Sequence, residues 1–172
     1  MHSNYLTTVY GPVTPGLIKQ LAQVTRGLGG VWLTSRFIRL ENRFAALMNV
    51  VIDAEREREL RETLERRFPQ LIFVYAPASA TPRPRTKNLN LMVECIDRVG
   101  LTGDLASILA GLDLGVDEME CKRYKMEEIG EMVFSARLSL AVPVDADGLE
   151  IAGEIEALSE DVRVEIVEVR VS

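Results

Sequence analysis

The feature that most constrains this chain is an internal repeat whose two copies lie 84 positions apart. Between residues 16 and 28, six of thirteen residues recur without a gap. The recurring residues are Gly16, Leu17, Leu21, Ala22, Gly27 and Leu28, which match Gly100, Leu101, Leu105, Ala106, Gly111 and Leu112. A repeat of this length predicts two small domains of one fold, of about 80 residues each, rather than a solenoid.

The first half of the chain predicts the order strand, helix, strand, strand, helix, strand. Apolar patterns indicate strands over residues 5–10, 31–40, 44–52 and 71–75. Thr14 and Pro15 are expected to begin the first helix, whose apolar stripe ends at Leu28. Asp53 is expected to cap the second helix, which Pro69 stops.

The second half predicts the same order. Strands are expected over residues 88–96, 116–124, 131–142 and 163–171, with a helix over 101–112 and another that Asp147 and Glu150 begin. Residues 76–87 hold three of the seven prolines and are expected to form a linker. With right-handed crossovers, each half gives a four-stranded antiparallel sheet with two helices on one face. The predicted fold class is therefore α+β, as two tandem ferredoxin-like βαββαβ domains at residues 1–75 and 88–172.

Charge and hydropathy exclude several classes of protein. The net charge is −6 and basic residues are interleaved with acidic ones, so the chain has no basic stripe for nucleic acid. No run approaches the roughly 20 apolar residues of a membrane span, and the N-terminal residues show no secretory signal pattern. Cys95 and Cys121 are expected on strands separated by a third, so a bond between them is not expected. We expect a cytoplasmic protein that binds neither nucleic acid nor a membrane.

The sequence offers no catalytic constellation. His2 is the single histidine and lies at the start of the sequence, so no serine has a histidine that would activate it. The first loop lacks the paired cysteines of metal carriers, and the strands lack the aromatic residues that stack RNA bases on this fold. We therefore expect a protein that is not an enzyme, with no catalytic residue, no metal and no cofactor.

The first loop of each half carries a more specific pattern. It reads GPVTPGL over residues 11–17 and IDRVGL over residues 96–101. An apolar strand, the pattern G-x-D-R-P-G-hydrophobic and a helix resemble the start of an ACT domain. The similarity extends to GGVWLTSR over residues 29–36 and EMVFSARLSLAVP over residues 131–143. As a tandem pair, the chain resembles the family of the glycine cleavage system transcriptional repressor.

This resemblance implies a ligand site in each half. In the ACT family, the turn and the helix start offer backbone N–H groups to the carboxylate of an amino acid. The ligand-contacting positions that the resemblance implies are Gly11, Val13, Thr14, Pro15, Gly16, Leu17, Asp97, Arg98, Val99, Gly100 and Leu101. Among them, Asp97 is expected to receive the amino group and Arg98 to steer the carboxylate.

Both loops depart from the family pattern. Val13 and Thr14 stand where the pattern has Asp and Arg, and Val99 stands where it has Pro. A structural interpretation stays open, in which the glycines only shape the helix entry, Thr14 and Asp97 are helix caps and Arg98 is a surface charge.

The function that the resemblance implies is regulatory. We expect a non-catalytic homodimer that senses a small amino acid, with glycine as one candidate, and acts on a partner such as a DNA-binding transcriptional regulator. The ligand would lie between the loop of one domain and a strand edge of another. The alternative is a protein-interaction scaffold whose ligand sites have decayed.

Overall fold

The computed structural model describes residues 1–79 and 84–167. The chain divides into two compact units, Met1–Thr81 and Pro82–Ser172. The first unit contains β1 (His2–Pro12), α1 (Leu17–Gly27), β2 (Val31–Leu40), β3 (Arg43–Asp53), α2 (Glu57–Arg67) and β4 (Ile72–Pro77). The second contains β5 (Thr86–Ile96), α3 (Leu101–Gly111), β6 (Gly115–Met126), β7 (Glu131–Pro143), α4 (Gly148–Glu156) and β8 (Arg163–Ile166).

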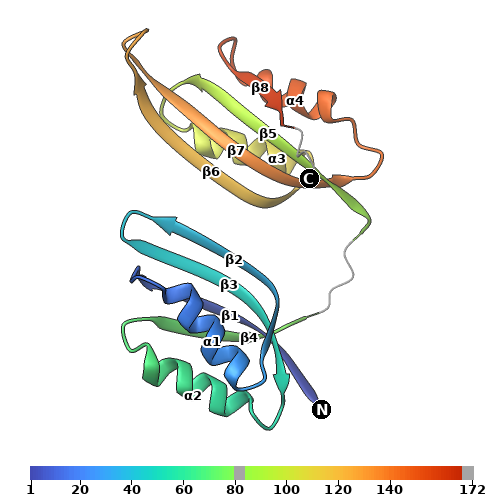
Figure 1. The fold of residues 1–172 in the computed structure, drawn as a ribbon. Helices are drawn as coiled ribbons and strands as arrows, with labels where there is room; N and C mark the ends of the chain where they lie inside the picture. Colours follow the sequence, from blue (N-terminus) through green and yellow to red (C-terminus); the bar gives the residue numbers. More distant parts are fainter. Residues whose placement is uncertain (80–83, 168–172) are drawn as a thin grey trace. The chain divides into compact units, whose positions relative to one another are not determined.

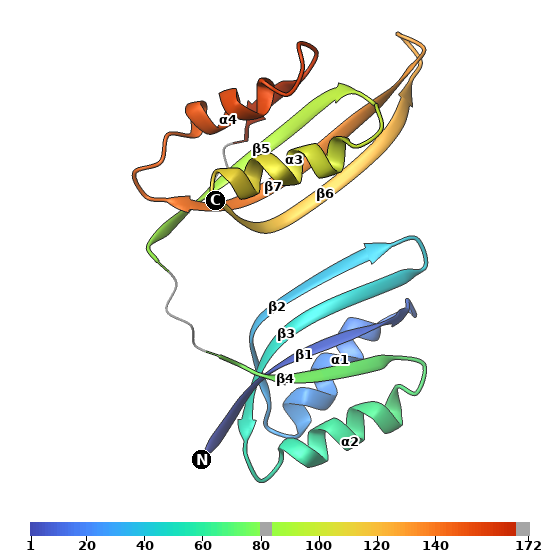
Figure 2. The same ribbon diagram turned by 180° about the vertical axis from the view of Figure 1, so that it is seen from behind.

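Each unit is a four-stranded antiparallel sheet with its two helices on one face, as predicted. The strand order is β2-β3-β1-β4 in the first unit and β6-β7-β5-β8 in the second. Figure 1 shows α1 and α2 together on one side of the first sheet, and Figure 2 shows α3 and α4 together on one side of the second. The predicted α+β fold of two tandem βαββαβ domains is confirmed.

Each unit buries its own apolar core between the sheet and the helices. Alternate residues of β1 and β3 face the helices, because successive side chains of a strand point to opposite faces. Fully buried members of the first core include Val9, Leu21, Met48, Ile52 and Leu60. Those of the second include Leu91, Leu105, Phe134, Leu138, Leu140 and Ile155.

The opposite faces of the two sheets differ in character. In the first unit that face carries exposed apolar side chains, which we name the apolar sheet face and define as Tyr10, Ile38, Leu47, Ile72 and Val74. The strand register places them in two adjacent cross-strand rows. In the second unit the corresponding face carries mainly polar and charged residues, among them Asn88, Asn90, Glu94, Glu120, Lys122, Ser135 and Arg137.

Several details differ from the sequence prediction. The first helix begins at Leu17, so its N-cap is Gly16 and not Thr14, and α2 begins at Glu57 with Arg56 as N-cap, so Asp53 is not a cap. The predicted cap Asp147 is confirmed, since its carboxylate accepts a hydrogen bond from the Leu149 N–H.

The connections at the ends of the units also differ. Strands β4 and β5 extend into the segment expected as a linker, of which residues 80–83 lie outside the described residues. β8 ends at Ile166, and residues 168–171 of the predicted last strand are likewise not described. Cys95 and Cys121 are both free thiols, on strands separated by β7 as expected. Within the described ranges, no helix has the length and apolar character needed to span a bilayer.

Candidate functional site

The loop between β1 and α1 ends in a helix start without a side-chain cap. Gly16, the N-cap, has a φ of 70° and a ψ of 12°, which is the left-handed region that favours glycine. The first turn of an α-helix leaves N–H groups without intrahelical acceptors, here those of Ile18 and Lys19. The first turn holds no acidic residue. The positive end of the α1 dipole is therefore available to an anionic ligand group.

The loop is tied to the β2–β3 hairpin. The backbone N–H of Val13 donates to the carbonyl of Asn42 at 2.9 Å, and the N–H of Leu17 donates to the carbonyl of Thr14 at 3.2 Å. These hydrogen bonds bring the end of β1, the start of α1 and the end of β2 together. Three segments that are distant in the sequence thus surround one site.

A cavity of about 340 Å³ opens at this junction. It is lined by Val13, Thr14, Gly16, Leu17, Ile18, Lys19, Phe37, Ile38, Arg39 and Phe44. The lining is mainly apolar, with Lys19 and Arg39 as its two cationic residues and no acidic side chain. Its volume lies in the lower part of the range of about 300–1,000 Å³ that is usual for small-molecule sites.

Arg39 is the most informative residue of this cavity. Its Nε donates to the carbonyl of Glu41 at 2.9 Å, within the turn that follows β2. Among residues 1–79 and 84–167, no carboxylate lies within ion-pair distance of Arg39 or of Lys19. The cavity therefore presents two cations whose charge no neighbouring acid neutralises.

The structure places the predicted residues of the first loop in two groups. Val13, Thr14, Gly16 and Leu17 line the cavity, whereas Gly11 and Pro15 do not. Gly11 is buried, and a Cβ there would lie 2.7 Å from Leu71 Cδ2. Its lack of a side chain serves the packing of β1 against the start of β4.

Sequence reasoning missed the residues that complete the cavity. These are Ile18 and Lys19 from α1, Phe37, Ile38 and Arg39 from β2, and Phe44 from β3. One signal was present in the sequence. Arg39 and Arg123 are 84 positions apart, which is the spacing of the repeat. The residues around Arg39 and those around Arg123 have little else in common.

The equivalent loop of the second unit is engaged in ion pairs. The carboxylate of Asp97 accepts a hydrogen bond from Arg123 Nε at 2.9 Å, and Arg123 Nη2 lies 3.5 Å from the Thr102 hydroxyl. Arg98 lies 3.8 Å from Asp104 on α3. Asp97, expected to receive an amino group, and Arg98, expected to steer a carboxylate, are thus each paired with a residue of the same unit.

The rest of this loop is open to solvent. Gly100 is the N-cap of α3 with a φ of 93°, and Val99 before it is fully exposed. Leu101 is buried in the core. An added Cβ at Gly100 would meet no atom within 4 Å, and at Gly16 only the Gln20 amide at 3.7 Å. Glycine is favoured at positions 16 and 100 by the positive φ of the backbone and not by lack of space for a side chain.

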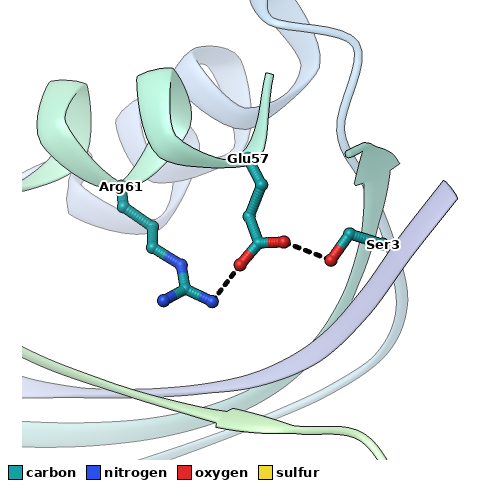
Figure 3. Close-up of polar contacts among 3 residues, drawn as sticks. All are labelled: Ser3, Glu57 and Arg61. Carbon is teal, nitrogen blue, oxygen red and sulfur yellow. Dashed lines mark hydrogen bonds and ion pairs between the residues drawn. The ribbon is translucent and has the colours of Figure 1, made fainter. Parts of the chain in front are cut away.

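A second polar cluster lies near the start of β1, away from the cavity at its other end. In Figure 3, Glu57 on α2 lies between Ser3 and Arg61 and contacts both. The Arg61 guanidinium also lies 4.7 Å and 4.4 Å from the ring centres of Tyr5 and Tyr75. Burial raises the pKa of the Tyr5 hydroxyl, which stays protonated at neutral pH. The cluster attaches α2 to β1 and holds no activated nucleophile.

Metal binding has no support in the described part of the chain. It contains no group of three or more His, Cys, Asp or Glu side chains that could hold a metal ion. Burial raises the pKa of both Cys95 and Cys121, so both thiols are protonated at neutral pH.

Comparisons with known proteins agree with the observed fold. Residues 4–72 match the sequence profile of the ACT domain family. The crystal structure of an unknown protein from Galdieria sulphuraria is 20% identical with a TM-score of 0.81, covering 98% of this chain and 100% of that one. A candidate glycine cleavage system transcriptional repressor is 17% identical with a TM-score of 0.75, covering 98% of this chain and 99% of that one. The search of curated proteins found no match.

These two structures share the fold of this chain along almost its whole length, and the profile match adds the family of the first unit. Residues 4–72 match the ACT domain family, and the chain joins this N-terminal unit to a second unit of the same βαββαβ fold.

Proposed function

We propose that this chain is a non-catalytic regulatory protein that senses a small amino acid in the cavity of its N-terminal unit. The single observation that carries the proposal is the cavity itself, which combines an uncapped helix N-terminus with two cations that have no ion-pair partner among the described residues. The ligand carboxylate would lie against the N–H groups of Ile18 and Lys19, with Arg39 beside it. Charge-assisted hydrogen bonds of this kind are among the stronger polar interactions in proteins.

The apolar wall favours an amino acid with an apolar side chain over glycine. Val13, Leu17, Phe37 and Phe44 contribute to that wall. Each CH₂ group that it covers stabilises the complex by about 0.8 kcal/mol. A leucine-sized side chain covers the wall, whereas glycine leaves it in contact with water. The amino group would find its acceptors on backbone carbonyls, because no acidic side chain lines the cavity.

A second copy of the chain is the partner that we propose for the apolar sheet face. Tyr10, Ile38 and Val74 are 43%, 65% and 52% exposed, so this face keeps much apolar surface in water. Arg36, paired in register with Leu47, borders this face, and a two-fold axis can set the apolar residues of two copies against each other. Ile38 belongs both to this face and to the lining of the cavity, which places the ligand next to the proposed interface.

Regulation would follow if the proposed dimer interface had two arrangements and the ligand bound one of them more tightly than the other. The ligand cannot shift the equilibrium by more than its difference in affinity, and coupling of this kind is about 1–3 kcal/mol. The net charge of −6 argues against direct binding of DNA. Any effect on transcription would therefore need a DNA-binding regulator as a further partner.

Calorimetry and thermal unfolding with the twenty common amino acids test the proposed function. A ligand at a hundred times its Kd stabilises the folded protein by about 2.7 kcal/mol. The variant Arg39→Gln should lose most of this effect. Arg26→Gln, which removes a cation from the last turn of α1, is the charge-matched control and should keep it. A flat response of the wild type to every amino acid would favour the interaction scaffold instead.

A further inference from the structure

The two units hold an arginine at the same place and use it differently. Arg39 and Arg123 are 84 positions apart, and each is paired in register with a phenylalanine of the next strand, Phe44 or Phe134. Each arginine lies at the end of an edge strand and approaches the first loop of its unit. They are therefore structurally equivalent residues.

The loop residues at the equivalent position of the two units differ in charge. The position 84 residues before Asp97 is Val13, and both backbone N–H groups bond to the adjacent hairpin, Val13 to Asn42 and Asp97 to Met132. In the second unit Asp97 holds Arg123 at 2.9 Å, with the guanidinium 5.0 Å from the Phe134 ring centre. In the first unit, Val13 offers Arg39 no anion.

We propose that only the N-terminal unit binds the amino acid, because in the C-terminal unit Asp97 takes the place of the ligand carboxylate at Arg123. This inference rests on the function proposed above. According to this inference, the residue at position 13 or at its equivalent, position 97, determines whether a unit can bind the carboxylate of an amino acid.

Electrostatics explains why Asp97 blocks a ligand. The side chain of Asp97 is only 21% exposed and is part of the chain, so it competes with a free carboxylate at every concentration. A ligand carboxylate that reached Arg123 would also lie close to Asp97, and like charges at such distances repel. An internal ion pair of this kind acts against the ligand without any change of fold.

Exchange of the two residues tests the inference. In Val13→Asp, we expect the new carboxylate to pair with Arg39 and to lower the affinity of the cavity for a probe such as L-leucine by about tenfold. In Asp97→Val, Arg123 is released, and the stoichiometry of binding should rise from one to two per chain. Val13→Asn and Asp97→Asn, similar in size and uncharged, separate the effect of charge from that of shape.

The readouts assign each event to its unit. Trp32 is the single tryptophan, and its ring centre lies 5.8 Å from that of Phe37, which lines the cavity. Its fluorescence therefore reports binding in the first unit. Calorimetry with L-leucine, L-isoleucine and L-phenylalanine gives affinity and stoichiometry, and circular dichroism shows that each variant is folded. The second site of Asp97→Val should bind without a change in Trp32 fluorescence.

The outcomes separate this inference from the proposed function. Two equivalent sites in the wild type, or unchanged affinity in a folded Val13→Asp variant, would overturn the inference and leave the proposed function standing. Absence of binding of any of the twenty common amino acids to the wild type would overturn both. Binding of one amino acid per chain in the wild type, weakened by Val13→Asp and raised to two per chain by Asp97→Val, supports the inference and the proposed function.

Discussion

At the scale of single residues, glycine serves backbone conformation in the first loop of each unit. Gly16 and Gly100 are helix N-caps with positive φ, and no close neighbour of either would meet a Cβ. Gly103 differs from them, because it lies inside α3 with ordinary helical geometry and open space around it. The same substitution should therefore have opposite effects at Gly100 and at Gly103.

We predict that Gly100→Ala destabilises the second unit by about 1 kcal/mol or more, because a left-handed conformation is costly for a residue with a Cβ. Gly103→Ala should stabilise it by about 0.8–1 kcal/mol, since alanine is the better helix former. Chemical unfolding of the two variants and the wild type measures both effects. Two changes of the same sign would contradict this assignment of the glycines.

The sequence pointed to several loop residues that line the candidate cavity, but not to Gly11 and Pro15 lying outside it or to the residues opposite the loop. The repeat and the family pattern pointed to Gly16 and Asp97 directly. The family pattern did not include Lys19, in the first turn of α1, or Arg39, whose recurrence at Arg123 was the only signal for it. Arg39 lines the cavity because the end of β2 lies beside the start of α1. The pairing of Asp97 with Arg123 likewise depends on two segments 26 residues apart in the chain.

At the scale of elements, periodicity predicted the strands and helices because each buries one face. The helix starts were predicted less well. Thr14 and Asp53 are residues that often cap helices, but the chain turns further before each helix begins, at Leu17 and at Glu57. Cap preference is a local signal, whereas the length of each turn depends on where the helix must pack.

One turn joins elements of the second unit through a carboxylate. Asp161, just before β8, accepts a hydrogen bond from the Ile96 N–H at the end of β5 at 2.8 Å and another from the Ser159 hydroxyl. These hydrogen bonds, with that from Ser159 the larger contribution, lower the pKa of Asp161 below its ordinary value of 3.8.

A lowered pKa fixes the sign of a pH dependence. The charged form of Asp161 contributes stability that is complete above pH 3.8 and is lost as the pH falls through the lower pKa of the folded state. Asp161→Asn should therefore make the free energy of unfolding less dependent on pH below that value. Asp145→Asn, an exposed carboxylate in the same unit, is the control. Equal acid dependence in the wild type and in Asp161→Asn would contradict this prediction.

At the scale of the whole molecule, two units of one fold have diverged on the sheet face that the helices leave open. The apolar face belongs to the N-terminal unit, which also holds the cavity lined by Lys19 and Arg39. The C-terminal unit carries a polar face and an internally paired arginine. The repeat in the sequence predicted the duplication, but this difference between the units depends on side chains that only the sheet register brings together.

A charge on the apolar sheet face should prevent dimer formation. We predict that Leu47→Lys makes the protein monomeric in light scattering at concentrations where the wild type is a dimer, because a buried unpaired charge is costly. Leu47 is 48% exposed, so the monomer should keep its fold. Arg137→Lys, on the corresponding face of the second unit, is the control. A wild type that is monomeric throughout would contradict the proposed interface.

The central claim is that the cavity of the N-terminal unit receives an amino acid through its carboxylate. Titration of the ¹⁵N-labelled protein with L-leucine, followed by NMR, tests it most directly. The account predicts shifts of the backbone amide signals of Ile18 and Lys19 and of the Nε–H signal of Arg39, with the Arg123 signal unchanged. Binding that leaves these signals in place, or that moves the loop of the second unit instead, would contradict it.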